Sequence, residues 1–490
     1  MKKCLSLSLV VLVVLFMAMP ASAEMPVIAP KYVFMFIADG QGSPQISATQ
    51  FYLGTLANPD APVPMPAPLS FTDFPYTGIM TTYDATSFCP DSASTATSMA
   101  SGEKTLSGVL NYDVDLAESF MIITEYAKEA GKKVGVLTSV SLDHATPAAY
   151  YAKAKSRNEY YDIALQGVTG TTIDLLGGGG FLQPTGKEKD QPGVVEMALA
   201  NGFVLANDNE AIRAMSTNDA RSLMILPDLD GSMGMQYEID RVRKVADGQD
   251  SMSLAELTAQ SIQVLDNDSG FFMMVEGGKI DWSGHANDAK TSIMETIAFS
   301  DAVQVAVDFA AAHPEDTLII VTGDHETGGL TIGFATTAYE THFDYLINQD
   351  ISFADFDAII SGLRDADVGF EDALMDIERH FGLTTTPDQP LTMTDSEIAK
   401  LREAFDMSMM DKDAREIGEA EQLAYGGYEP LSMALCHMLN NKAGIAYTSY
   451  AHTGLQIPVY AMGVGAENFS GSYDNTDIYK KTMAIMELAQ

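Results

Sequence analysis

Cysteine is scarce in this sequence, with three residues in 490. Cys4 lies in an apolar stretch at the N-terminus, so Cys89 and Cys436 are the two that remain in the body of the chain. They allow one disulfide bond, and the sequence leaves open whether it forms. Neither belongs to a C-x-x-C pair, so a structural zinc site of the finger type is not indicated. The fold must therefore be stabilised mainly by its hydrophobic core.

Basic residues are also few. Lys and Arg total 28 against 67 Asp and Glu, which gives a formal net charge of −39 at pH 7. A field of this sign repels nucleic acids and anionic membranes at long range, so nucleic-acid binding is not expected. The simplest interpretation of the acidity is a solvated surface, and adaptation to a salty medium is the weaker alternative.

Long hydrophobic runs are absent after the N-terminus. Lys2 and Lys3 precede an apolar stretch over residues 4–19, and residues 20–23 (Pro-Ala-Ser-Ala) form a small-residue cleavage site. We predict a signal peptide at residues 1–23, a mature chain from Glu24, and export to the periplasm or the extracellular space. The alternative is an uncleaved anchor, but the stretch is shorter than the ~20 residues that a membrane span needs. No membrane association is expected after cleavage.

Five short runs rich in apolar and β-branched residues predict strands, at residues 32–38, 133–139, 271–275, 317–322 and 457–462. Segments with helical periodicity separate them, which is the rhythm of a parallel sheet. We predict an α/β fold in which a mostly parallel central sheet is flanked by helices on both faces. Polar residues follow four of the five runs, and ligands of such sheets bind beyond the carboxyl ends of the strands.

Two segments interrupt this rhythm. Between about residues 335 and 447 helical patterns dominate, including a capping box from Thr394 to Glu397 before an apolar periodic segment. We predict a largely helical insertion there, near the C-terminal third. Four consecutive glycines at residues 177–180 predict a tight turn, and they are not a phosphate loop because no GK[ST] follows.

Three of the eight histidines stand where metal ligands are expected. Asp281 and His285 are four residues apart, so one helical turn would put both on one face. Asp324 and His325 directly follow a predicted strand, where adjacent ligands can splay toward two points. His452 comes just ahead of the last predicted strand. Each context alone more often holds a structural histidine, but their joint placement near strand ends favours a metal centre.

A candidate nucleophile, Ser92, follows Pro90 and Asp91. Those two residues can start a helix of small residues, whose free backbone N–H groups would face a phosphate. A serine hydroxyl is a weak nucleophile at neutral pH and needs an adjacent base or a metal. No histidine is near Ser92 in the sequence, which favours a metal. From this segment alone, a capped helix without chemistry is an equal alternative.

With these segments in view, the sequence resembles the alkaline phosphatase family over nearly the whole mature chain, so residues 24–490 are interpreted as the catalytic domain. Six motifs occur in the family's order, and coincidence is very improbable. They are residues 37–42 (IADGQG), 91–93 (DSA), 144–148 with 156–158 (HATPA and SRN), 276–281 (EGGKID), 322–325 (TGDH) and 452–454 (HTG).

The resemblance implies two zinc ions and one magnesium ion, with ligand types that suit each metal. It also implies an arginine that holds two phosphate oxygens. For the first zinc, the implied ligands are Asp281, His285 and His452. For the second zinc they are Asp39, Asp324 and His325, and this ion would also coordinate Ser92. For magnesium they are Asp39, Thr146 and Glu276, and the phosphate-binding arginine is Arg157.

Two positions depart from the best-studied bacterial pattern. His144 stands where that pattern has Asp, and Trp282 where it has Lys. This pair resembles some cold-adapted and marine members of the family. It leaves open which ion occupies the third metal site and how strongly phosphate binds.

The resemblance implies hydrolysis of small-molecule phosphate monoesters by in-line attack of Ser92, followed by hydrolysis of a phosphoserine. A phosphodiesterase of the same superfamily is one alternative, but Ser92 together with Arg157 favours a monoester. A sulfatase is not supported, because no C-x-P-x-R signature surrounds Cys89. A secreted cation-binding protein without catalysis is the alternative from another class. The physiological substrate and the oligomeric state stay open, with a homodimer among the alternatives.

Overall fold

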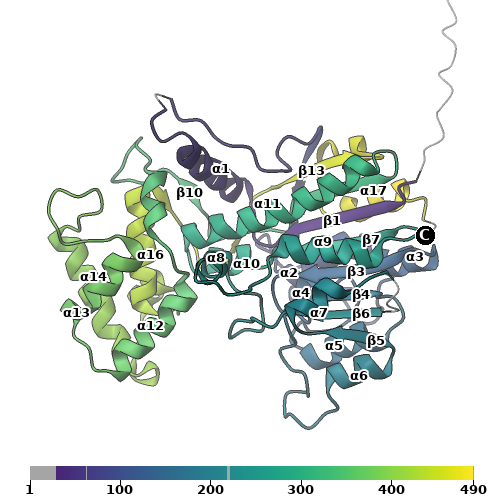
Figure 1. Cartoon of the computed structure of the whole chain (residues 1–490), viewed down its shortest axis with the longest axis horizontal. Helices are drawn as coiled ribbons and strands as arrows, with labels where there is room; N and C mark the ends of the chain where they lie inside the picture. The colour runs from purple at the N-terminus through teal and green to yellow at the C-terminus, as the bar shows by residue number, and fades with distance from the viewer. Residues whose placement is uncertain (1–28, 62, 218–220, 489–490) are drawn as a thin grey trace, which may run out of the picture.

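A ten-stranded sheet forms the centre of the computed structural model (Figure 1), with the order β14-β2-β13-β8-β1-β7-β3-β4-β6-β5. The structure describes residues 29–61, 63–217 and 221–488, so the predicted signal peptide lies outside the described residues. All five predicted runs are strands of this sheet. They are β1 (Tyr32–Ala38), β3 (Lys133–Thr138), β7 (Phe271–Glu276), β8 (Thr317–Gly323) and β13 (Ile457–Gly463).

The other five strands of the sheet were not predicted, because they are short or broken by glycine. They are β2 (Tyr76–Thr81), β4 (Leu175–Gly178), β5 (Phe203–Ala206), β6 (Arg221–Ile225) and β14 (Gly471–Asp474).

The prediction of a tight turn at residues 177–180 was wrong, because Gly177 and Gly178 belong to β4. A side chain there would collide with the neighbouring strand. A Cβ at Gly178 would lie 2.0 Å from the backbone oxygen of Thr138. Glycine is therefore required for close strand contact rather than for a turn.

One strand runs against the others in the described sheet. β13 is antiparallel to both β8 and β2, whereas every other pairing in the sheet is parallel. In its register with β8, Val459 lies opposite Thr322 and Gly463 opposite Leu318. The beginning of β13 thus meets the end of β8. This reversal brings His452, which precedes β13, to the edge where the parallel strands end.

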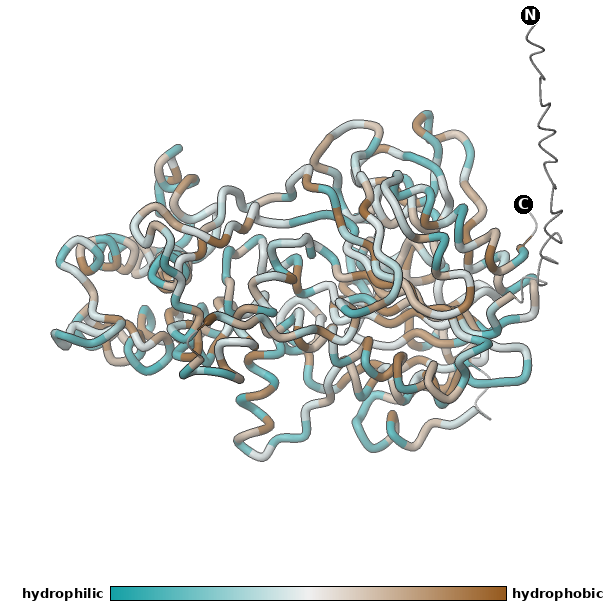
Figure 2. The backbone as a smooth tube through the Cα atoms, turned by 90° about the horizontal axis from the view of Figure 1, so that it is seen from above, coloured by the Kyte–Doolittle hydropathy of each residue, from teal (hydrophilic) through white to brown (hydrophobic). Residues whose placement is uncertain are grey.

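Helices cover both faces of the sheet, as predicted, because successive side chains of a strand point to opposite faces. From β1, Val33 and Met35 pack on one side and Phe34 and Phe36 on the other. The first face is covered mainly by α2 (Ser92–Ser101), α3 (Ile123–Glu129), α5 (Tyr160–Thr169), α6 (Val194–Ala200) and α17 (Thr476–Ile485). The second is covered mainly by α7 (Asn209–Ala214), α9 (Leu254–Leu265) and α11 (Ala289–Ala312). Hydrophobic segments gather in the interior of the larger part of the molecule, on the right in Figure 2.

Helices dominate the segment between β10 (Thr331–Ile332) and β11 (Ile445–Ala446), which pair with each other and so bring its two ends together. Its core includes Phe356, Phe381 and Leu439, and also touches α1 (Ser43–Ala57). The capping box at Thr394 is confirmed, with Glu397 at its third position. The helices are η1 (Phe343–Asn348), α12 (Phe353–Asp365), α13 (Phe370–Phe381), α14 (Asp395–Ser408), η2 (Lys412–Ala414), α15 (Glu419–Tyr425) and α16 (Pro430–Ala443).

Two short helices, α8 (Glu238–Ala246) and α10 (Lys279–His285), lie between this helical part and the sheet (Figure 1). Cys89 is exposed and Cys436 is buried, and the two are not bonded to each other. Within the described residues, no helix combines the length and apolar character needed to cross a membrane.

A buried carboxylate on α11 gives the fold a pH dependence. Glu295 accepts a hydrogen bond from the backbone N–H of Glu238 at 2.6 Å. Burial raises the pKa of Glu295 from 4.5 to about 8, with the positive charge of Lys279 acting in the opposite direction. The protonated form is therefore favoured in the folded state, so this contribution to stability is full below about pH 4.5 and is lost as the pH rises through 8.

We expect Glu295→Gln to reduce that alkaline loss. Between pH 5 and 8, the free energy of unfolding of the wild type should fall relative to the variant by up to about 1.4 kcal/mol per pH unit. Urea unfolding of both proteins across this range measures the difference. The exposed Glu315→Gln is the matched control. Parallel pH profiles for wild type and Glu295→Gln would contradict the prediction.

Candidate active site

The predicted site residues gather at the edge where the parallel strands end. Ile37 pairs in register with Glu276, and Ala38 with Gly323, so the ends of β1, β7 and β8 lie at one level. Asp39 and Asp324 follow the first and last of these strands directly, while Glu276 ends β7. Parallel strands thus bring together three carboxylates that are distant in the sequence.

The first cluster consists of Asp281, His285 and His452. Asp281 Oδ1 lies 3.3 Å from His285 Nε2 and 3.4 Å from His452 Nε2, and the two Nε2 atoms are 3.1 Å apart. Each Nδ1 lies 2.6 Å from a backbone carbonyl oxygen, that of Tyr450 for His285 and that of Pro90 for His452. A neutral imidazole that donates from Nδ1 leaves its Nε2 lone pair free, so both rings can offer nitrogen to a metal.

The second cluster consists of Asp39, Asp324 and His325. His325 Nε2 lies 3.4 Å from Asp39 Oδ1 and 3.3 Å from Asp324 Oδ2. Asp324 and His325 both face this second cluster, and His325 also groups with Asp281 and His452 of the first cluster. The ring of His325 stacks on that of His452 with centroids 3.6 Å apart, so the first and second clusters are neighbours.

The third cluster consists of Asp39, His144 and Glu276, with Thr146 beside it. Thr146 donates a hydrogen bond to Asp39 Oδ2 at 3.2 Å. Each of the three residues has a buried atom that lacks a hydrogen-bond partner among the described residues, namely Asp39 Oδ1, His144 Nδ1 and Glu276 Oε1. Leaving such atoms unpaired is costly, and a cation would satisfy the two carboxylate oxygens. The three clusters therefore fit metal ions by their ligand types and spacing, and His325 lies within reach of both the first and the second.

The charges of this site are strongly perturbed. Burial and the nearby charge of Asp324 raise the pKa of Asp39 well above its usual value, and burial raises that of Glu276 to about 8. Burial alone would also raise the pKa of Asp281, but the charge of His285 and hydrogen bonds from both histidines of the first cluster hold it well below its usual range. Four buried carboxylates in one place need positive charge, from protons or from metal ions.

Ser92 and Arg157 lie next to these clusters. Ser92 is the first residue of α2, and its Oγ lies 3.3 Å from His325 Nε2. Asp91 caps α2 by accepting from the N–H of Ser94, and also forms an ion pair with Arg157 Nη1 at 2.9 Å. The helix of small residues predicted at this point is therefore present, and its N-terminus presents backbone N–H groups beside the hydroxyl.

The two variant positions are in contact. The rings of His144 and Trp282 are 5.9 Å apart in an edge-to-face arrangement, and His144 Nε2 lies 3.3 Å from Arg157 Nη2. Burial, together with the charge of Arg157, lowers the pKa of His144 to about 3. His144 is therefore neutral at the site.

Several residues that support the site were not predicted. The hydroxyl of Thr327 donates to Asp281 Oδ1 at 2.5 Å. Glu326 accepts from Gln45 Nε2 at 2.7 Å and from the hydroxyl of Thr453, which ties the turn after β8 to the strand carrying His452. Glu326 and Thr327 directly follow His325, and this adjacency was the available signal. The roles of backbone carbonyls leave no signal in a sequence.

Comparison with known proteins agrees with this arrangement. The alkaline phosphatase family model matches residues 30–488. Alkaline phosphatase 3 of Bacillus subtilis is 31% identical over 93% of this chain and 89% of its own length. The cold-active alkaline phosphatase of a psychrophilic Shewanella is 26% identical with a TM-score of 0.74, over 93% of this chain and 99% of its own.

A solved mutant of the alkaline phosphatase from the Antarctic bacterium TAB5, with Mg bound in its M3 site, has the same fold. It is 24% identical with a TM-score of 0.62 and covers 94% of this chain and 99% of its own. The family match over almost the entire described chain, the relative above 30% identity and the shared fold agree with one another. The chain therefore belongs to the alkaline phosphatase family of hydrolases.

Proposed function

We propose that this enzyme hydrolyses phosphate monoesters through a phosphoserine at Ser92, with two zinc ions in the first and second clusters and a magnesium ion in the third. One observation carries the proposal. The hydroxyl of Ser92 lies 3.3 Å from His325 Nε2, between a set of metal-binding side chains and the N-terminus of α2. No neighbouring base is needed if a cation at the second cluster lowers the pKa of this hydroxyl.

When bound, the ions would activate the hydroxyl or water and stabilise charge on the entering and leaving oxygens. The residues of the chain position the reacting groups. Arg157, held by Asp91, would bind two phosphate oxygens with its planar fork. The N-terminus of α2 would stabilise negative charge beside Ser92.

In-line displacement then puts the leaving oxygen on the side opposite Ser92. For a phosphate that binds between the two clusters, with Ser92 at the second, that side would be the first cluster, where His285 and His452 lie. Attack of water from the same side would hydrolyse the phosphoserine and release phosphate.

The third cluster differs from an all-oxygen site. The imidazole of His144 lies within ligand distance of Asp39 and Glu276. Nitrogen ligands suit zinc better than magnesium, so zinc and magnesium both need to be measured there. We also propose that the enzyme acts outside the cytoplasm, on the basis of its N-terminal residues.

Removal of metal is the direct test of this function. We expect purified protein to hydrolyse phosphate monoesters at alkaline pH, to lose this activity in excess EDTA, and to regain it when zinc and magnesium are added together. The release of phosphate and the content of each metal are measured in parallel. A protein that binds the metals but hydrolyses no phosphate ester would instead favour the alternative of a cation-binding protein.

Ser92→Ala tests the nucleophile. We expect monoester turnover to fall by roughly three orders of magnitude or more, because the variant lacks the hydroxyl that would form the covalent intermediate. Zinc content should stay almost unchanged, since the three residues of each cluster remain. Ser101→Ala, at the far end of the same helix, is the matched control. A near-normal rate in Ser92→Ala would remove this residue from the mechanism.

Arg157→Ala tests the preference for monoesters. We expect kcat/KM for a monoester to fall by about tenfold more than kcat/KM for a diester, because a bidentate guanidinium contact needs two free phosphate oxygens. Arg157→Lys, which keeps the charge without the fork, should rescue only part of the loss. Equal losses on both substrates would show that Arg157 does not bind the phosphate, and would favour the diesterase alternative.

A further inference from the structure

A pocket of about 640 Å³ opens beside the first cluster. Its size is within the range of small-molecule binding sites in proteins. It lies between the loop that precedes α8, the start of α12 and the segment before α16. The residues that matter here are Gln236, Tyr237, Trp282, His285, Phe353 and Tyr428.

Aromatic side chains form much of the wall of this pocket. The rings of Tyr237 and Phe353 are 5.6 Å apart, and those of Phe353 and Tyr428 are 5.9 Å apart, both edge to face. Lys279 Nζ lies 3.6 Å from the ring centre of Tyr237, which adds a cation–π contact on the buried side of that ring. These contacts hold the aromatic wall in a defined arrangement before any ligand binds.

The charged groups that border the pocket are already paired. Asp230 forms an ion pair with Lys279 at 2.5 Å, Lys244 with Asp228 at 2.8 Å, and Asp355 with Arg243 at 2.6 Å. These pairs leave little net charge to attract a charged ligand.

Two neutral polar groups in the wall remain available. The side-chain amide of Gln236 and the hydroxyl of Tyr428 make no hydrogen bond with any described residue, and both side chains are half-buried. They could bind polar substituents of a ligand. The pocket is therefore suited to an uncharged, largely aromatic group.

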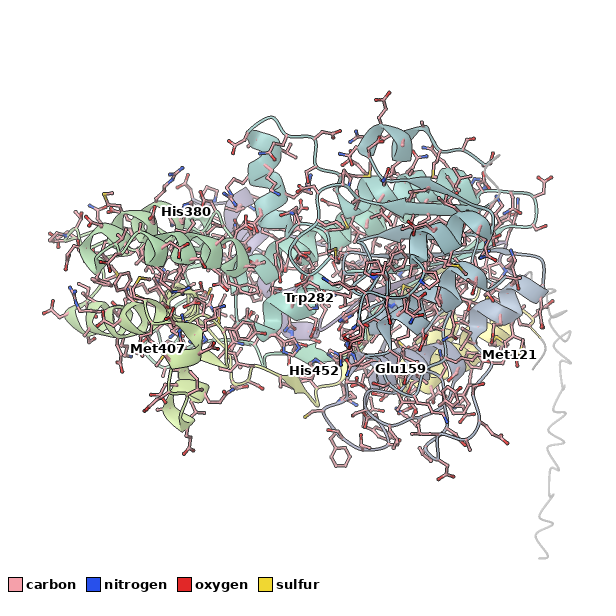
Figure 3. The ribbon with its side chains drawn as sticks, turned by 90° about the horizontal axis from the view of Figure 1, so that it is seen from below. Met121, Glu159, Trp282, His380, Met407 and His452 are labelled. Atoms are coloured by element: carbon pink, nitrogen blue, oxygen red, sulfur yellow. The ribbon has the colours of Figure 1, made fainter. Side chains whose placement is uncertain are left out.

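The position of the pocket links it to the reaction. Trp282 and His285 belong both to α10 and to the pocket wall, and His285 is also part of the first cluster. Trp282 contacts His144, which contacts Arg157. Figure 3 shows Trp282 in the middle of the molecule, between the helical part that carries His380 and Met407 and the sheet. An ester whose leaving oxygen lies at the first cluster would have its alcohol at this pocket.

We propose that this pocket is the leaving-group subsite and that it favours phosphate monoesters whose alcohol carries a planar aromatic ring. This inference rests on the proposed function, because that function defines which side of the phosphate the alcohol occupies. Tyr428 and Phe353 would contact the ring, Trp282 would contact the ring where it joins the phosphate, and Gln236 would bind a polar substituent. Aliphatic esters would bind through their phosphate alone.

Kinetics with two substrates test the subsite. We expect Tyr428→Leu to lower kcat/KM for phenyl phosphate by about fivefold, the value of one aromatic contact, mainly through KM. The same variant should change kcat/KM for glycerol phosphate by less than about twofold, because the phosphate contacts are intact. Tyr345→Leu, in the same helical part but outside this pocket, is the matched control. Equal changes for both substrates would overturn the proposal.

A binding experiment separates this inference from the proposed function. Trp282 is the only tryptophan of the chain and lies in the pocket wall next to His144, so its fluorescence reports on ligand binding at the pocket and at the adjoining phosphate site. In the metal-loaded enzyme, phenylphosphonate should change this fluorescence and bind about fivefold more tightly than propylphosphonate, and Tyr428→Leu should abolish the difference. Equal affinity of the two phosphonates for the wild type would overturn the subsite. If the enzyme prefers phenylphosphonate but hydrolyses no phosphate monoester, only the proposed function is overturned.

Discussion

The structure depends on the burial of four carboxylates at one edge of the sheet. Asp39, Glu276, Asp281 and Asp324 are all nearly inaccessible to solvent. Burial and mutual repulsion disfavour their charged forms, so the site needs compensating positive charge. In the described chain that charge comes from neighbouring histidines and Arg157, and metal ions would compensate the carboxylates more completely. The raised pKa values of Asp39, Glu276 and Asp324 follow from this burial.

The backbone determines where the histidines of the site point. The turn after β8 carries His325 toward the second cluster, and the reversed direction of β13 brings His452 to the same edge. Backbone carbonyl groups at Tyr450 and Pro90 then orient the rings of the first cluster through their Nδ1 atoms. Glu326 connects the turn that carries His325 to the strand that carries His452. The ligands are thus held in place by the fold before any ion binds.

The helical part forms one wall of a pocket beside the first cluster. Its residues Phe353 and Tyr428 meet Tyr237 and α10 to form the pocket next to His285. In the proposed function, the edge of the sheet would supply the groups for phosphate chemistry and the helices would surround the alcohol. In a family whose common reaction concerns the phosphate, differences in the helical part are a physical route to different substrates.

The sequence by itself determined the elements whose signals are local. Local signals, which depend on neighbouring residues, predicted the five strongest strands, the start of α2 at Ser92, the one-turn spacing of Asp281 and His285, and the capping box at Thr394. The order of the motifs along the chain identified the family. The tertiary structure alone decided the reversed direction of β13, the use of the glycine run in β4, the ion pair of Asp91 with Arg157, and the aromatic pocket. These features join residues far apart in the chain, as Ser92 and His325 are. Local spacing fixes the geometry of one turn or one strand, but strand pairing and packing depend on the competition of contacts across the whole chain.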